Sequence, residues 1–223
     1  MGAGGDSSAH VDISGMLQVG PQSAGSNPGP VCYGRGNTLP TVTDANVVLG
    51  RIAASRPLGG GMLGQLDEAS ARQAIDTHVA QPLGLDVMAA AEAILTVANA
   101  KMAGAIRVSI EKGHDPRQFA YMPFGGGGAL HVCAMMREVG VGIGIVPRYP
   151  GVTSALGCVM ADMRHDAVQT LNQALDDLNL VQLRERLDQL AQSGQQRLDT
   201  AGVSFVRVEE QIGLDMHYVG QTH

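Results

Sequence analysis

The fold of this chain is decided by residues 119–146, which read FAYMPFGGGGALHVCAMMREVGVGIGIV. The first four residues, 119–122, are apolar enough for a buried strand, and 143–146 predicts a second buried strand. Residues 129–139 between them have the spacing of a helix, which Gly140 ends. A strand, a helix and a strand in this order make a βαβ unit, whose strands are parallel. We therefore predict an α/β fold in which these two strands are neighbours.

The rest of the chain predicts helices and short strands around that unit. Helices are expected at 68–79 (with Asp67 as N-cap and Pro82 as stop), from about Asp86 to Gly113, at 153–160 and at 178–198. Strands are expected at 9–13 and 16–19, joined at Ser14 and Gly15, at 163–170, and twice between 203 and 218.

Composition excludes several classes of protein. The 223 residues include 30 glycines, and 44% are apolar, which is a globular composition. The net charge of −6 without a block of basic residues argues against a nucleic-acid partner. The three cysteines are widely spaced without a CxxC pair, so neither a disulfide framework nor a zinc site is indicated. No apolar run approaches the roughly 18 residues of a membrane span, and we expect a cytoplasmic protein with no membrane partner.

The loop Gly125, Gly126, Gly127 and Gly128 lies between the first strand and the helix. Glycines there let backbone N–H groups face a ligand closely, and the helix dipole favours an anion. The loop is therefore suited to a phosphate or to the sugar and base of a nucleotide. No Lys-Ser/Thr pair follows it and GxGxxG spacing is lacking. A tight turn whose glycines only permit packing is the alternative.

Eleven short motifs, in order and spacing, resemble the hydantoinase A/oxoprolinase family over nearly the whole chain. They are GAGGDS (2–7), GPQSAG (20–25), PGPVCYGRG (28–36), PTVTDAN (40–46), ANAKMA (98–103), GHDPR (113–117), FGGGG (124–128), PRYPG (147–151), SALG (154–157), RHD (164–166) and YVGQ (218–221).

The resemblance implies a ribonuclease H-like lobe with parallel strands and flanking helices, as in actin, heat-shock chaperones and sugar kinases. It implies that ATP binds with its adenosine at Gly125 to Gly128 and its phosphates close to Gly4 and Gly5. The phosphate and magnesium loops of the family carry an Asp-Gly-Gly-Thr segment that these residues lack. Its loop normally reads Phe-Gly-Gly-Ala-Gly-Pro, and Ala129 in place of the proline should make the loop more mobile.

The activity implied is ATP-dependent opening of a cyclic amide such as a hydantoin, N-methylhydantoin or 5-oxoproline. An ATP-dependent ketone carboxylase and a non-catalytic nucleotide-binding module remain alternatives. The chain is expected to be a piece of a larger enzyme, truncated at both ends and inactive alone, that works with a second hydantoinase-type subunit. Residues 1–170 would belong to its nucleotide-binding lobe and 171–223 to the start of the next segment.

Few side chains stand out as catalytic candidates. Asp44 and Asn46 form a polar cluster flanked by apolar residues and could face the cleft. The alternative is an N-cap formed by Thr43 or Asp44. His131 and Cys133, on the helix after the loop, are expected to pack in or behind the site. The pairs His114-Asp115 and His165-Asp166 could be metal ligands or acid–base pairs. Adjacent side chains diverge, however, and each pair lies beside a predicted element boundary, so we expect the Asp to cap a turn.

Overall fold

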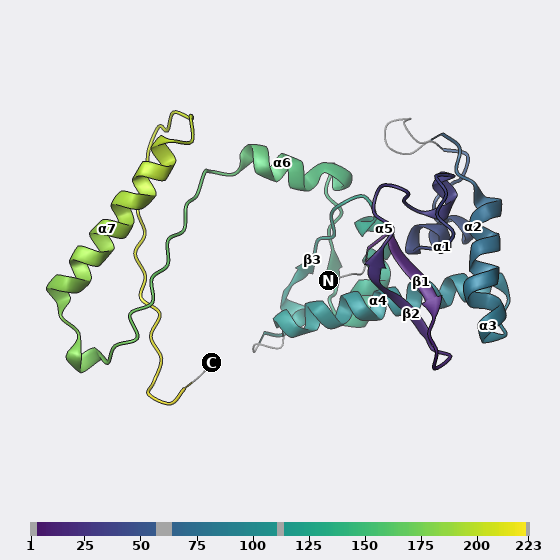
Figure 1. Cartoon of the computed structure of the whole chain (residues 1–223), viewed down its shortest axis with the longest axis horizontal. Coiled ribbons are helices and arrows are strands. Elements are labelled where there is room, and N and C mark those ends of the chain that lie inside the picture. Colours follow the sequence, from purple (N-terminus) through teal and green to yellow (C-terminus); the bar gives the residue numbers. More distant parts are fainter. Residues whose placement is uncertain (1–3, 57–63, 111–113, 222–223) are drawn as a thin grey trace. The chain divides into compact units, whose positions relative to one another are not determined.

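A computed structural model describes residues 4–56, 64–110 and 114–221 (Figure 1). It divides into two compact units, Met1–Val159 and Met160–His223, which are described separately. The predicted boundary between 170 and 171 concerns the family's domains and stays a prediction.

The first unit begins with an antiparallel hairpin of β1 (Ser7–Val11) and β2 (Leu17–Ser23). Its turn is built by Asp12, whose Oδ1 accepts hydrogen bonds from the N–H groups of Ser14 and Met16 at 2.8 and 3.0 Å. The predicted hairpin is confirmed.

Short helices follow the hairpin. They are the 3-10 turn η1 (Val31–Tyr33), α1 (Val42–Val48) and α2 (Glu68–Ile75). The predicted N-cap of α2 is confirmed, because the Asp67 carboxylate accepts a hydrogen bond from the Ser70 N–H at 2.9 Å. Such a cap satisfies one of the N–H groups that the first turn leaves open.

The predicted end of this helix is wrong. The chain continues into the π-helical segment η3 (Asp76–Ala80) and then α3 (Gln81–Leu83). Pro82 does not stop the helix, because it follows a π-helical turn in which the Gln81 N–H donates to the Asp76 carbonyl, five residues back. Gly84 ends it instead, with a φ of 65° that glycine adopts readily.

The longest element of the first unit is α4 (Val87–Ile110), whose 24 residues span about 36 Å. Its predicted end at Gly113 lies outside the described residues. Helix α4 packs against α1, β2 and α5, so it joins two parts of the unit. Lys101 on α4 donates a hydrogen bond from Nζ to the Val19 carbonyl of β2 at 2.8 Å. The main core contains, among others, Ala9, Val19, Val42, Val47, Leu66, Ile75, Val79, Ile94 and Leu95.

The βαβ unit is present as predicted. Strands β3 (Ala120–Tyr121) and β4 (Ile143–Gly144) are parallel, and α5 (Gly128–Val139) lies between them in sequence. Gly140 ends α5 with a φ of 79°. The described chain is therefore a mixed α/β structure with a parallel strand pair. A second small core, of Ala103, Met135, Val139 and Val141, holds α5 against α4.

The expected burial of both strands is wrong. In the first predicted strand Phe119 and Met122 are each 46% exposed, and in the second Ile143 is 62% and Ile145 47% exposed, because nothing in the described residues covers these side chains. Apolar composition predicted the strands but could not say whether a further layer would cover them.

The remaining elements include α6 (Thr153–Met160), which matches its prediction, and α7 (Leu180–Asp199) in the second unit. Single 3-10 turns are η4 (Pro116–Gln118), η5 (Pro150–Val152) and η6 (Leu175–Asp177). The strands predicted at 163–170 and between 203 and 218 are absent from residues 160–221, where the backbone finds no ladder partner.

Within the described ranges, no single helix has both the length and the apolarity to cross a membrane. The pair 68–83 and 87–108 passes such a test only when both helices are counted together, and the two are bent by 86°.

Candidate functional site

The glycine loop occupies the carboxyl end of β3 and the amino end of α5 (Figure 1). Gly125 has a φ of 93°, a conformation open to glycine, and its N–H donates to the Pro150 carbonyl at 2.8 Å. Gly127 is the N-cap of α5 and supplies no side-chain acceptor. In the first turn of α5 the N–H groups of Gly128 and Leu130 donate to the carbonyls of Gly125 and Gly127, so the donors left for a ligand are those of the loop before the helix.

The glycines of the loop differ in how much space surrounds them. A Cβ added at Gly126 or Gly127 would meet nothing within 4 Å among the described atoms. At Gly128 it would contact Pro123 at 3.4 Å, so that glycine is partly a packing residue. The N–H groups of Gly126 and Gly127 donate to no acceptor in the described chain. This open backbone is what a bound nucleoside would need.

Gly4 and Gly5 lie shortly before β1, and Gly5 is hydrogen-bonded to α1. The Gly5 carbonyl accepts from both the N–H and the Oγ1 of Thr43, each at 2.8 Å. A Cβ at Gly5 would lie 2.9 Å from that Oγ1, so a side chain there would push this link apart. The Gly4 N–H donates to Ser7 Oγ at 2.8 Å. These contacts explain locally why glycines occupy both positions. The predicted location of Gly4 and Gly5 near the phosphates of ATP stays a prediction.

Asp44 is fully buried, at 0% exposure, and does not face an open cleft. Its carboxylate accepts from the N–H of Val31 at 3.1 Å, of Cys32 at 2.8 Å and of Thr41 at 2.8 Å, and from Thr41 Oγ1 at 2.9 Å. Thr41 is the N-cap of α1 and forms a capping box with Asp44. The capping alternative thus describes Asp44, with Thr41 rather than Thr43 at the N-cap.

Asn46 is 1% exposed and lies two residues further along α1. Its Nδ2 donates to the Val42 carbonyl at 2.9 Å, whereas its Oδ1 has no hydrogen-bond partner in the described chain. An unpaired buried acceptor costs about 1–3 kcal/mol. The atom that remains available is therefore the side-chain amide oxygen Oδ1 of Asn46, and the catalytic role predicted for Asn46 stays a prediction.

His131 on α5 is 6% exposed, and its Nδ1 lies 2.7 Å from Oδ1 of Asn99 on α4. Burial, with the positive charge of Arg51, lowers the pKa of His131. Asn99 and Arg51 were not among the candidates from sequence. Asn99 could have been found from its spacing, because this polar residue is four positions from both Leu95 and Ala103 and therefore lies on the buried face of α4.

Of the two adjacent His-Asp pairs, only His114-Asp115 serves a turn as expected, because residues 162–170 form no turn. Asp115 is the N-cap of η4 and pairs with Arg117 at 2.9 Å. Asp166 pairs with Arg164 at 2.7 Å in the second unit. In the ranges that the structure describes, no three His, Cys, Asp or Glu side chains group to hold a metal ion.

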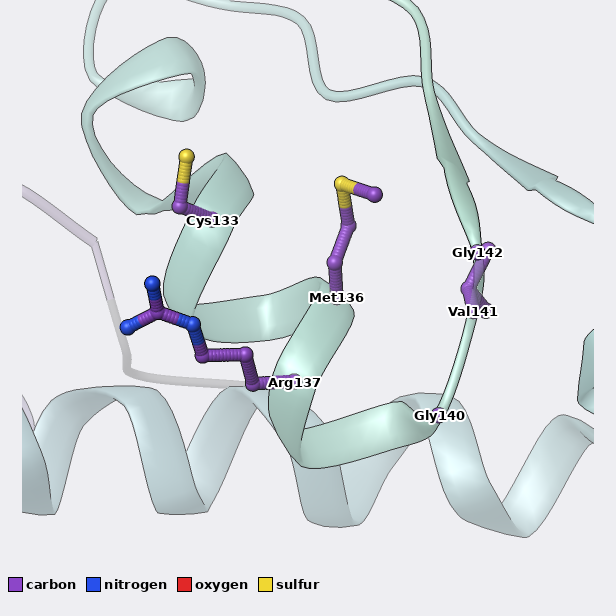
Figure 2. A pocket seen from close by; sticks show the side chains of 6 residues that line it. All are labelled: Cys133, Met136, Arg137, Gly140, Val141 and Gly142. Carbon is purple, nitrogen blue, oxygen red and sulfur yellow. The ribbon is translucent and has the colours of Figure 1, made fainter.

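The thiols offer no nucleophile in the loop. Cys32 is buried, and burial together with Asp44 raises the pKa of its thiol. The expectation that Cys133 is packed is wrong, because Cys133 is exposed and lines an open hollow of about 390 Å³, shown in Figure 2. In the figure, Cys133, Met136 and Arg137 come from α5, and Gly140, Val141 and Gly142 from the segment that leaves it. The hollow thus lies toward the carboxyl end of α5, away from the glycine loop.

The arrangement is that of an α/β protein with a glycine loop leading from a parallel strand into a helix. A model of the hydantoinase/oxoprolinase family matches residues 1–167. The chain belongs to the hydantoinase/oxoprolinase family.

Several relatives cover almost the whole chain. It is 44% identical to caprolactamase subunit alpha of Pseudomonas jessenii over 100% of the chain and 32% of that protein. It is 35% identical to the acetophenone carboxylase gamma subunit of Aromatoleum aromaticum, over 100% of the chain and 31% of the relative. Identity to 5-oxoprolinase 1 of Arabidopsis thaliana is 33%, over 98% of the chain and 18% of that protein.

The fold agrees with a solved relative. The crystal structure of the ATP-dependent caprolactamase from Pseudomonas jessenii superposes with a TM-score of 0.71 at 44% identity, over 92% of this chain and 30% of that one. The chain spans about a third of the length of these bacterial relatives.

Proposed function

We propose that the chain contributes the adenosine site to an ATP-dependent enzyme that opens cyclic amides. The observation that carries this is the open backbone at Gly126 and Gly127, at the carboxyl end of a parallel strand and the start of α5. Ligands of open α/β sheets bind at that end of the strands. The relative with 44% identity is an ATP-dependent caprolactamase, which supports ATP as the nucleotide.

The residues present fit the nucleoside part of ATP better than its phosphates. Glycines without a Cβ let a flat base and a sugar approach the main chain, and the free N–H groups can donate to them. When bound, ATP supplies the phosphoryl group that activates the amide carbonyl oxygen toward water. This chain positions the nucleotide for that transfer, in which alignment and charge neutralisation matter most. Magnesium and its ligands belong, in this proposal, to residues outside the 223.

The substrate class follows from the activities in the names of the relatives. Caprolactamase and 5-oxoprolinase both act on cyclic amides, and together they favour a lactam-like ring. The acetophenone carboxylase subunit, at 35% identity, makes a ketone carboxylase the second candidate. ATP hydrolysis that depends on a cyclic amide, and not on a ketone with bicarbonate, distinguishes the two.

The proposed function extends to the fold of the whole lobe and to a partner subunit. The first unit would be part of a ribonuclease H-like lobe, as in actin and sugar kinases. Two of the relatives are subunits by name, caprolactamase alpha and acetophenone carboxylase gamma, which supports a partner subunit in a cytoplasmic complex. Asn46, with its unpaired Oδ1, is the side chain we would still test for a role toward substrate.

The test is Gly127→Val in the complete protein, with any partner subunit it requires. A valine would fill the space that the nucleoside needs, so the KM for ATP should rise at least about tenfold, which corresponds to about 1.4 kcal/mol. The melting temperature should change little, because the space is open and φ is not positive there.

Gly142→Val is the matched control. Gly142 also has nothing within 4 Å of an added Cβ, and it lies beyond the other end of α5. We expect its KM for ATP to equal that of the wild type. A large loss of melting temperature in Gly127→Val with an unchanged KM would instead assign the loop to packing.

A further inference from the structure

Asn99 determines which nitrogen of His131 carries the proton. The Oδ1 of Asn99 can only accept, so His131 Nδ1, at 2.7 Å, must be the donor. In a neutral imidazole the other nitrogen, Nε2, then bears the lone pair. Neither ring nitrogen has another hydrogen-bond partner in the described part of the chain.

The surroundings favour the neutral ring. His131 is 6% exposed, and both burial and the positive charge of Arg51 lower its pKa. Arg51 itself is exposed, and its side chain has no partner in the described residues. Among the groups that act on His131, no carboxylate is present to stabilise an imidazolium. His131 is thus a hydrogen-bond acceptor at neutral pH.

His131 lies in α5 one helical turn after the glycine loop. Side chains on a helix lean toward its amino end and cover the preceding turn. His131 is four residues after Gly127 and three after Gly128, so it shares their face of α5. Neither glycine has a side chain between the ring and the loop, and the position beside Gly127 is open. A buried polar side chain with an unpaired ring nitrogen thus lies one helical turn from Gly127.

We propose that His131 is a binding residue of this site, and that Nε2, fixed as an acceptor by Asn99, recognises an N–H or O–H donor of the nucleoside. The inference rests on the proposed function and adds base or sugar selectivity to it. The donor is either the 6-amino group of adenine or a ribose hydroxyl. Asn99 is the positioning residue, because it acts through the ring that it holds.

The tautomer is tested first, on the wild-type chain, by nitrogen-15 NMR of its histidines. The His131 signals are identified by their loss in His131→Gln. We expect a protonated Nδ1 and an unprotonated Nε2 near neutral pH, and a mixture of tautomers in Asn99→Ala. A protonated Nε2 in the wild type would overturn the proposal, because that nitrogen could not accept.

Nucleotide binding is tested next, on the complete protein with its subunits, by calorimetric titration of ATP, ITP and 2′-deoxy-ATP. His131→Leu should weaken ATP binding about tenfold, the worth of one hydrogen bond lost at a desolvated site. His131→Gln, which keeps an acceptor, should restore part of the affinity. If the donor is the 6-amino group, His131→Leu also abolishes the preference for ATP over ITP. If it is the ribose 2′-hydroxyl, the affinity for 2′-deoxy-ATP is the same in wild type and variant.

Two failures are distinguishable. Wild-type affinity of His131→Leu for all three nucleotides, together with lost binding in Gly127→Val, would refute the role of His131 and leave the nucleotide site in place. Absence of ATP binding by the complete wild-type protein would refute the proposed function, and the role of His131 with it.

Discussion

Asp44 shows at the scale of one residue how a loop far away in sequence becomes fixed. Its carboxylate joins η1, through the N–H groups of Val31 and Cys32, to the N-cap of α1 at Thr41. We expect Asp44→Ala to lower the free energy of unfolding by about 3 kcal/mol or more, because it leaves several buried donors without an acceptor. Urea unfolding measures the loss.

Asp67→Ala is the control for that change. Asp67 also caps a helix, but its side chain is exposed, so the loss should be near 1 kcal/mol. Equal losses in the two variants would show that the burial of Asp44 adds nothing to its capping role.

His131 gives the chain a predictable response to acid. Burial and Arg51 depress its pKa, so the folded protein keeps the ring neutral where the unfolded chain, with a pKa near 6.5, takes up a proton. The unfolded state then binds more protons, and stability falls as pH drops below about 6.5 toward the folded pKa. His131→Gln should reduce this loss. Urea unfolding at about pH 7 and about pH 5 measures it in both proteins, and an equal acid loss would contradict the assignment.

The sequence identified the polar cluster at 43–46, but it did not predict which hydrogen bonds its side chains form. A buried Asp or Asn must find partners, and that much follows from composition. Which partners it finds depends on tertiary contacts, since Val31 and Cys32 lie 13 and 12 residues away from Asp44. For the same reason Asn99 was missed, because its partner His131 is 32 residues distant on another helix.

At the scale of elements, α5 can be tested at its carboxyl end. Gly140 has a φ of 79° and nothing within 4 Å of an added Cβ, so Gly140→Ala changes the backbone energy alone. The left-handed conformation costs an L-residue about 1–2 kcal/mol, and we expect that loss in urea unfolding. Gly142→Ala, at an equally open position without a positive φ, should be close to neutral. A similar loss in both would mean that the left-handed φ is not the cause.

The sequence correctly predicted those structural features that depend only on neighbouring residues. The βαβ order, Gly140 as the end of α5 and Asp67 as a cap each depend on residues within a few positions, and each is present. The strands expected at 163–170 and between 203 and 218 have the right alternation but no ladder partner in the described chain. Alternation of apolar and polar residues shows which face of a strand would be buried. A strand forms only when a second strand pairs with it, and the alternation cannot predict that partner.

For the whole molecule, the two units differ in how much they bury. The first has an extended core built on α4, whereas Leu183 of α7 is the one buried side chain described in the second. Exposed apolar residues such as Leu180, Val206 and Met216 are frequent there. A mixed α/β class follows from sequence, but the amount of core in each unit does not, because burial depends on what packs against each element.

The last prediction concerns what the 223 residues bind by themselves. The described glycine loop offers backbone donors and no cluster of cations, and the net charge of −6 opposes a triphosphate. Phosphates that no magnesium or basic side chain neutralises stay solvated and add little affinity. We therefore expect ATP and adenosine to bind this chain equally weakly, with a Kd on the order of 1 mM, in calorimetric titrations. Gly127→Val should abolish both. Much tighter binding of ATP than of adenosine would contradict the division proposed here, since it would mean that this chain itself holds the phosphates, and Gly4 and Gly5 would then be the first positions to change.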